Sequence, residues 1–221
     1  MNMISIISLG ALCLIMAVLN IFFGERKNWQ GLLVRGLAIA SCIALVQVCA
    51  SLKSLSNVLP LFVTLGLVIL VLVEALKFAD AENEKSNVIA RTALAAVGFV
   101  LIACAGISLS EFNIFALLGG VAFGVAFGLI VCAIKKYKLP AQIFSEIFFF
   151  MSVGLILGFA LMGIITSTHM ISAICLLGGG IVLLFQKFMY VLGKGGKALV
   201  NLANFLYVVA LTAISLSIYF Y

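Results

Sequence analysis

Residues 114–134 read IFALLGGVAFGVAFGLIVCAI, a stretch that contains no charged side chain. A helix needs about 20 apolar residues to cross a hydrocarbon core about 30 Å thick. This stretch therefore predicts a transmembrane helix, and similar apolar runs recur along the whole chain.

Seven further runs of this kind are separated by short polar segments, none of which is long enough to fold as a soluble domain. We therefore predict an all-α polytopic membrane protein, a single bundle of eight transmembrane helices that forms one domain over residues 1–221. The predicted helices cover residues 3–23, 36–51, 58–78, 88–109, 114–134, 143–163, 171–190 and 199–219.

The composition supports this assignment. Hydrophobic residues make up 66% of the chain and charged residues 9%, whereas a soluble domain has roughly 45–50% and about 25%. A soluble enzyme and a disordered chain are therefore excluded. The six cysteines lie singly inside apolar runs, a pattern that indicates neither a disulfide framework nor a zinc site. We expect no metal, no cofactor and, because no basic–aromatic motif occurs, no nucleic-acid partner.

Basic residues are distributed very unevenly between the two sides of the predicted bundle. Of the 13 Lys and Arg residues, twelve fall in or beside the odd-numbered loops and only Lys53 falls on the other side. The positive-inside rule then places the odd-numbered loops in the cytoplasm and both termini outside.

Glycines recur at a spacing of four residues in two of the predicted helices. Gly120, Gly124 and Gly128 follow this spacing in the fifth helix, and Gly154 and Gly158 follow it in the sixth. Small residues so spaced let helix backbones approach closely in lipid. Close helix packing is the simpler interpretation, and a crevice for a lipid chain or substrate is the alternative.

Ionisable residues within the apolar runs are costly and require a partner or a purpose. All of them fall near the predicted cytoplasmic helix ends, so a polar cavity should open to the cytoplasm while the outer half stays dry. Interfacial snorkelling of the long cations, pairing of Glu74 with Lys77, and structural pairing of Glu146 are the simpler explanations. The residues concerned are Arg35, Glu74, Lys77, Arg91, Glu146 and Lys187.

Several segments together resemble the lysoplasmalogenase (YhhN-like) family of eight-helix integral membrane proteins. The resemblance covers most of the chain and lies in the order of its segments and in their apolar composition. The segments that carry it are ERKNWQGLLVRGLAIASCIAL (residues 25–45, with Arg35), VLVEALKF (71–78, with Glu74), ALLGGVAFGVAFGLIVCAIKKYKL (116–139, with Gly119 and Phe123), GGIVLLFQKFMYVL (179–192) and NLANFLYVVALTAISLS (201–217, with Tyr207, Ile214 and Ser217).

The chain departs from the family at polar positions. Phe127 stands where the family has a histidine, Gln186 and Lys187 align with its Ser-Asp, and Leu211 aligns with its glutamine. Only Glu74 keeps an acid at a family acid position.

The resemblance implies hydrolysis of the vinyl ether bond of a lysophospholipid, a reaction that suits an acid and a base. Glu74 would then be the candidate acid or base, with Gln186 and Lys187 beside it. If Glu74 and Lys187 faced each other, the site would hold opposite charges, which disfavours the carboxyl as a general acid. The residues expected to bind the substrate are Arg35, Arg91, Glu146 and Tyr207.

Two other functions remain open at this point. One is a catalytically inactive lipid-binding or scaffold protein of the same fold, and the other is a small transporter, which the lack of charges near the membrane midplane disfavours. Membrane lipid is the expected partner in each of the first two cases. The resemblance and the small size favour the plasma membrane of a bacterium, and the oligomeric state is left open.

Overall fold

A computed structural model describes residues 3–23, 29–53, 58–78, 84–110, 112–166, 169–192 and 196–221. For residues 77, 78, 84–86, 108–110, 191 and 192 it describes the backbone only.

The described residues form eight helices and no strand, each helix being long and apolar enough to cross a membrane. The prediction of an all-α, eight-helix membrane protein is therefore confirmed. The helices are α1 (Met3–Phe23), α2 (Trp29–Lys53), α3 (Val58–Phe78), α4 (Glu84–Ser110), α5 (Ile114–Lys135), α6 (Pro140–Thr166), α7 (Met170–Leu192) and α8 (Lys197–Ser217).

The main differences from the predicted boundaries lie at the polar helix ends. Helix α2 begins at Trp29 instead of residue 36, and α4 and α6 begin at Glu84 and Pro140. An apolar window marks only the part of a helix inside hydrocarbon, whereas backbone hydrogen bonding continues into the interface. Pro140 suits the first position of α6, because the amide hydrogen that proline lacks would have no helical partner there.

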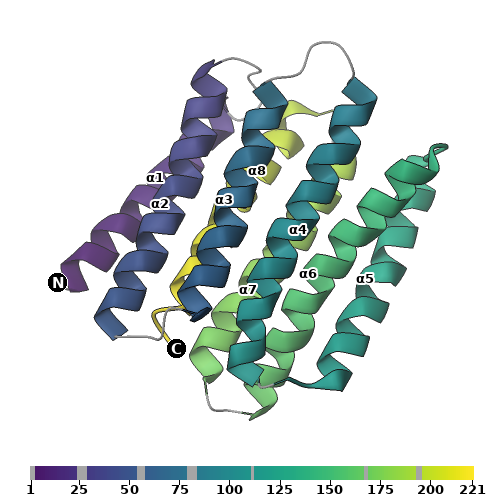
Figure 1. The fold of residues 1–221 in the computed structure, drawn as a ribbon. Helices are drawn as coiled ribbons and strands as arrows, with labels where there is room; N and C mark the ends of the chain where they lie inside the picture. The colour runs from purple at the N-terminus through teal and green to yellow at the C-terminus, as the bar shows by residue number, and fades with distance from the viewer. Residues whose placement is uncertain are drawn as a thin grey trace.

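The helices form a row with a second, shorter layer behind it (Figure 1). Along the row, α1, α2, α3, α4, α6 and α5 lie side by side in that order, so α6 and not α5 packs against α4. Helices α7 and α8 form the second layer, in which α8 contacts α1 and α2 while α7 contacts α6.

Consecutive helices run in opposite directions, so both labelled chain ends lie at the same end of the bundle (Figure 1). We call the opposite end the basic end. It holds the ends of α1, α3, α5 and α7 and the starts of the helices that follow them. By sequence, the twelve basic residues assigned above to the odd-numbered loops fall in or beside the connections at this end, and Arg26, Lys27 and Lys194 lie outside the described residues.

Close backbone contact joins α5 to α6, as the glycine spacing predicts. A Cβ atom added to Gly120 would lie 2.5 Å from the Gly154 carbonyl oxygen, and one added to Gly124 would overlap the Phe150 carbonyl oxygen. Gly158 meets the Ala116 carbonyl oxygen in the same way. These glycines are therefore packing residues. Because the backbones touch at these positions, no crevice separates the two helices there.

Candidate functional site

Arg35 and Glu74 form an ion pair between α2 and α3 near the basic end. The Arg35 guanidinium lies 3.1 Å from Glu74 Oε2, and the side chains are 12% and 3% exposed. Arg35 donates a hydrogen bond to this oxygen. Burial of a carboxylate in an apolar bundle is costly without such a partner, and the guanidinium supplies both charge and direction.

Tyr207 of α8 belongs to the same region. Its ring packs against the hydrophobic core, and its phenol lies within electrostatic reach of both Arg35 and Glu74. Two consecutive helices, α2 and α3, and the distant α8 therefore contribute to one polar site. We call this group the Arg35 site, consisting of Arg35, Glu74 and Tyr207.

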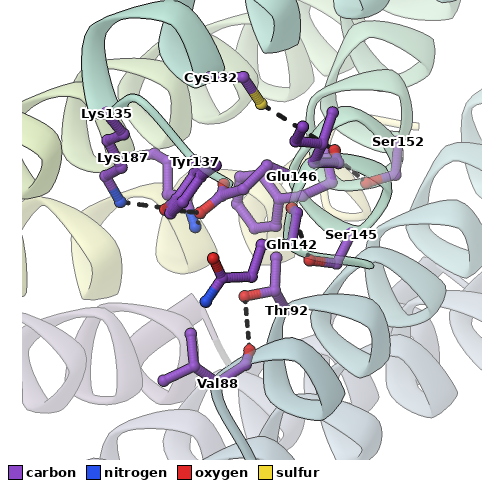
Figure 2. A network of polar contacts seen from close by, with 12 residues as sticks. Val88, Thr92, Cys132, Lys135, Tyr137, Gln142, Ser145, Glu146, Ser152 and Lys187 are labelled. Carbon is purple, nitrogen blue, oxygen red and sulfur yellow. Dashed lines mark hydrogen bonds and ion pairs between the residues drawn. The ribbon is translucent and has the colours of Figure 1, made fainter. Parts of the chain in front are cut away.

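A second group is built around Glu146 of α6. Lys187 Nζ of α7 lies 3.0 Å from Glu146 Oε2, and Lys135 Nζ of α5 lies 3.7 Å from Oε1. The Tyr137 hydroxyl, from the connection after α5, donates a hydrogen bond of 2.9 Å to Oε1. Figure 2 shows these side chains converging on the carboxylate. We call Lys135, Tyr137, Glu146 and Lys187 the Glu146 cluster.

Tyr137 remains a hydrogen-bond donor within this cluster. Burial raises the pKa of its phenol well above the ordinary value, and the negative charge of Glu146 raises it further. The phenol is therefore neutral at physiological pH and keeps the proton that it shares with Glu146.

An aromatic layer lies beneath the Glu146 cluster. Lys187 Nζ lies 4.5 Å from the centroid of the Phe149 ring, within the range of a cation–π interaction. Phe149 contacts Phe99 and Phe150 edge to face, each at a centroid distance of 5.5 Å. Phe127 packs on Phe150 at 5.6 Å. These rings place apolar surface directly below the charges, so the cluster is polar only toward the basic end.

The structure divides the predicted site residues into two groups. Glu74 is joined to Arg35, whereas Lys187 is joined to Glu146 and forms no ion pair with Glu74. The alternative in which Glu74 faces Lys187 is therefore wrong. The side chain of Lys77, the other partner considered for Glu74, lies outside the described residues.

Two further predicted residues stand apart from both groups. Arg91 and Gln186 are partly exposed, and neither forms a hydrogen bond or an ion pair with the residues that the structure describes. Phe127, at the position where the resemblance implies a histidine, is part of the aromatic layer.

Lys135 and Tyr137 were not expected to take part in a site. In the sequence they belong to the basic segment KKYK, which is typical of a solvated cytoplasmic loop. A tyrosine placed between lysines, directly before a helix that carries a buried acid, is the available signal. This signal is weak, because the sequence does not reveal which helix carries the hydrogen-bond acceptor of the tyrosine hydroxyl.

Buried polar groups also connect α1, α2 and α8. Asn20 donates a hydrogen bond of 2.7 Å to the Asn204 carbonyl oxygen, and Cys13 donates one of 3.3 Å to Ser41. These hydrogen bonds are internal and include no residue of the Arg35 site or of the Glu146 cluster. Among the described residues, no group of three or more His, Cys, Asp or Glu side chains is placed to hold a metal ion.

The chain matches no known family, no curated protein and no solved structure. Its function must therefore be argued from the two sites themselves. Each offers a buried carboxylate held by a cation: Arg35 pairs with Glu74, and Lys135 and Lys187 pair with Glu146.

Proposed function

We propose that this protein is a lysoplasmalogenase-like hydrolase of the bacterial plasma membrane, a divergent YhhN-like protein that cleaves the vinyl ether bond of a lysophospholipid at the cytoplasmic leaflet. The observation that supports the proposal most directly is the buried Glu74 carboxylate, only 3% exposed and held by Arg35 in a largely apolar bundle. An ionised side chain so placed is expensive, and intramembrane charges mark functional sites by default.

The reaction adds water across the vinyl ether and releases an aldehyde and an alcohol. Protonation of the alkenyl carbon gives an oxocarbenium ion, water attacks it, and the resulting hemiacetal collapses. In our proposal the Glu74 carboxylate stabilises the cation and takes the proton of the attacking water.

Arg35 and Tyr207 have supporting roles in this proposal. Arg35 fixes the orientation of the carboxylate through the hydrogen bond at 3.1 Å. Tyr207, whose phenol lies in the field of both charges, contacts the substrate beside them in this proposal. The paired carboxylate is an acceptor, so the proton that reaches the alkenyl carbon comes from water.

The test is aldehyde release from a lysoplasmalogen by the purified protein in detergent. Glu74→Gln keeps the size of the side chain but removes the base, so we expect turnover to fall about 10²-fold or more. Activity that survives in Glu74→Gln contradicts the proposed site.

The control is Ser172→Ala, which removes a buried hydrogen bond of 2.6 Å to the Ser217 carbonyl oxygen at the other end of the bundle. Turnover by this variant should stay within about threefold of the native chain, because a lost buried hydrogen bond costs only about 1 kcal/mol of stability on average. The helical content of both variants is compared by circular dichroism.

The second candidate function is lipid binding without turnover, on the same fold. Two observations favour it: each carboxylate is already paired with a cation, and Phe127 packs against aromatic rings. It predicts that lysophospholipid co-purifies with the folded protein and that no aldehyde appears in the assay above.

A further inference from the structure

A glutamine is exposed on the outer surface of α2. Gln47 falls within the apolar run of residues 36–51. Of the Asn and Gln side chains that the structure describes, only that of Gln47 is exposed, and the others are half-buried or buried. An amide in contact with hydrocarbon loses the hydrogen bonds that water would supply. The position of Gln47 therefore calls for a hydrogen-bonding partner.

The length of α2 places this amide below the membrane surface. The 25 residues from Trp29 to Lys53 rise about 37 Å, which exceeds a hydrocarbon core of about 30 Å. Gln47 precedes Lys53 by six residues, or about 9 Å along the helix. If the excess length is shared between the two ends of α2, the Gln47 side chain begins about 5 Å inside the hydrocarbon.

Gln47 uses only part of its hydrogen-bonding capacity within the chain. Nε2 donates a hydrogen bond of 2.8 Å to Oγ1 of Thr64 in α3. Nε2 has a second hydrogen, and Oε1 forms no hydrogen bond with the residues that the structure describes. One turn further along α2, the hydroxyl of Ser51 donates to the Gln47 backbone carbonyl oxygen at 2.8 Å. Gln47, Ser51 and Thr64 thus form a polar patch with unused donors and acceptors.

The patch lies on a side of the bundle that no other helix covers (Figure 1). Helix α2 packs on α1 and α3 at its sides and on α8 behind it. Lys53 Nζ lies 5.4 Å from the ring centroid of Tyr219, which follows α8, so its charge is directed toward the second layer. We call the uncovered surface the α2–α3 face. It consists of the polar patch and the exposed residues Leu37, Ala40, Leu61 and Leu65.

The α2–α3 face is large enough for a specific interface. Two adjacent helices about 30 Å long and together about 20 Å wide offer on the order of 600 Å² per copy, and specific interfaces begin at about 600 Å² per partner. Next to Ala40, a Cβ atom added to Gly36 would meet no atom within 4 Å. The backbone of α2 is therefore open to the close approach of another helix.

We infer that the α2–α3 face joins two copies of this chain in the membrane, with the two Gln47 amides hydrogen-bonded to each other across a two-fold axis perpendicular to the membrane. Such an axis brings each residue opposite the same residue at the same depth. An amide carries both a donor and an acceptor, so it is its own complement, whereas a lipid tail offers neither. The inference is independent of the proposed hydrolase activity.

The first test is disulfide cross-linking of the full chain in phosphatidylcholine vesicles. Ser51→Cys places a thiol on the face, and oxidation with copper phenanthroline should give a covalent dimer that persists as lipid dilutes the protein. Ser8→Cys is the matched control. Ser8 of α1 is also exposed and also donates 2.8 Å to its own helix, at Ile4, but it lies outside the α2–α3 face. It should cross-link no more than the native chain.

The second test measures association by energy transfer between fluorescently tagged copies as the lipid-to-protein ratio is raised. Gln47→Leu keeps the bulk of the side chain but removes the amide, so it should weaken association about fivefold or more. Thr64→Val removes only the internal acceptor and should associate within about twofold of the native chain. An amide that served only to join α2 to α3 predicts instead that both variants lose stability alike and that neither changes association.

The inference is overturned by three results in protein that circular dichroism shows to be folded. These are a Ser51→Cys chain that does not cross-link, a Ser8→Cys chain that cross-links to the same extent, and unchanged association of Gln47→Leu. Equal loss of association in Thr64→Val and Gln47→Leu also contradicts it, because the contact between the two amides does not require Thr64.

Discussion

At the scale of single residues, the chemistry of the bundle depends on which cations and hydrogen-bond donors contact each buried carboxylate. Glu74 is paired with a guanidinium, which fixes the orientation of the carboxylate. Glu146 is contacted by two ammonium groups and a phenol. An arginine pairs with a carboxylate in a defined plane, whereas lysines act as point charges that exchange partners readily. The first arrangement suits the orientation of a reacting group, and the second leaves the carboxylate between cations that can rearrange.

Tyr137 gives a spectroscopic test at this scale. Because its pKa is raised, the phenol should stay protonated when exposed tyrosines ionise near pH 10. The tyrosinate absorbance of the native chain and of Tyr137→Phe, measured per molecule between pH 9 and 11, should therefore coincide. A deficit of one tyrosinate in the variant would show that Tyr137 titrates normally.

The same raised pKa has a consequence for stability. Above pH 10 the unfolded chain releases the Tyr137 proton while the folded chain keeps it, so this group makes the free energy of unfolding fall as pH rises. Below pH 10 its contribution is fully present. The decrease in the free energy of unfolding above pH 10 should be smaller in Tyr137→Phe than in the native chain when both are unfolded by a denaturing detergent.

At the scale of helices, the contact between α5 and α6 holds the edge of the row together. Helix α5 packs mainly on α6, with only slight contact to α7. Its association with the bundle therefore depends on the glycine surface. In lipid such contact replaces the hydrophobic effect, which cannot draw apolar helices together.

Two alanine substitutions on α5 test this dependence. A Cβ atom at Gly124 would overlap the Phe150 carbonyl oxygen and lie 2.5 Å from Met151 Cα, so Gly124→Ala should lower the free energy of unfolding by about 1–3 kcal/mol. Gly119 is exposed on the same helix and has no atom within 4 Å of an added Cβ. Gly119→Ala should leave stability unchanged or raise it by up to about 1 kcal/mol. Equal losses in the two variants would contradict a close α5–α6 contact.

At the scale of the whole molecule, the charge distribution gives the bundle two unlike ends. Both acid-centred sites lie toward the basic end. The other end is held by ring contacts, including the stacking of His169 on Tyr221 at 4.2 Å. In the proposed function a lipid headgroup is therefore bound at one end only, which the positive-inside rule predicts to be the cytoplasmic end.

Orientation is tested with single cysteines at exposed positions. Lys53→Cys should react with a membrane-impermeant maleimide in intact cells, and Lys138→Cys only after the membrane is disrupted. The native cysteines lie within the helices, and the native chain serves as the background. Labelling of Lys138→Cys in intact cells would reverse the orientation and move both sites to the outer leaflet.

The helices could be predicted from the sequence because the length of an apolar run is a local property. The residues of α3 and α1 were predicted without error for this reason, and α2 was predicted too short because Trp29 to Arg35 extend beyond the apolar window. Pairing is not local. Glu74 and Arg35 are 39 residues apart, and Glu146 meets Lys187 only because α6 and α7 are neighbours. Candidate charges could thus be recognised, but their partners could not.

The hydrogen bond from Asn20 to the Asn204 carbonyl oxygen joins groups 184 residues apart in the chain. Asn20 is almost completely buried. During synthesis the ribosome adds all of those 184 residues before this partner exists. Until α8 enters the membrane, the Asn20 amide lacks this acceptor, so although α1 packs early against α2, its hydrogen bond to α8 is among the last contacts to form.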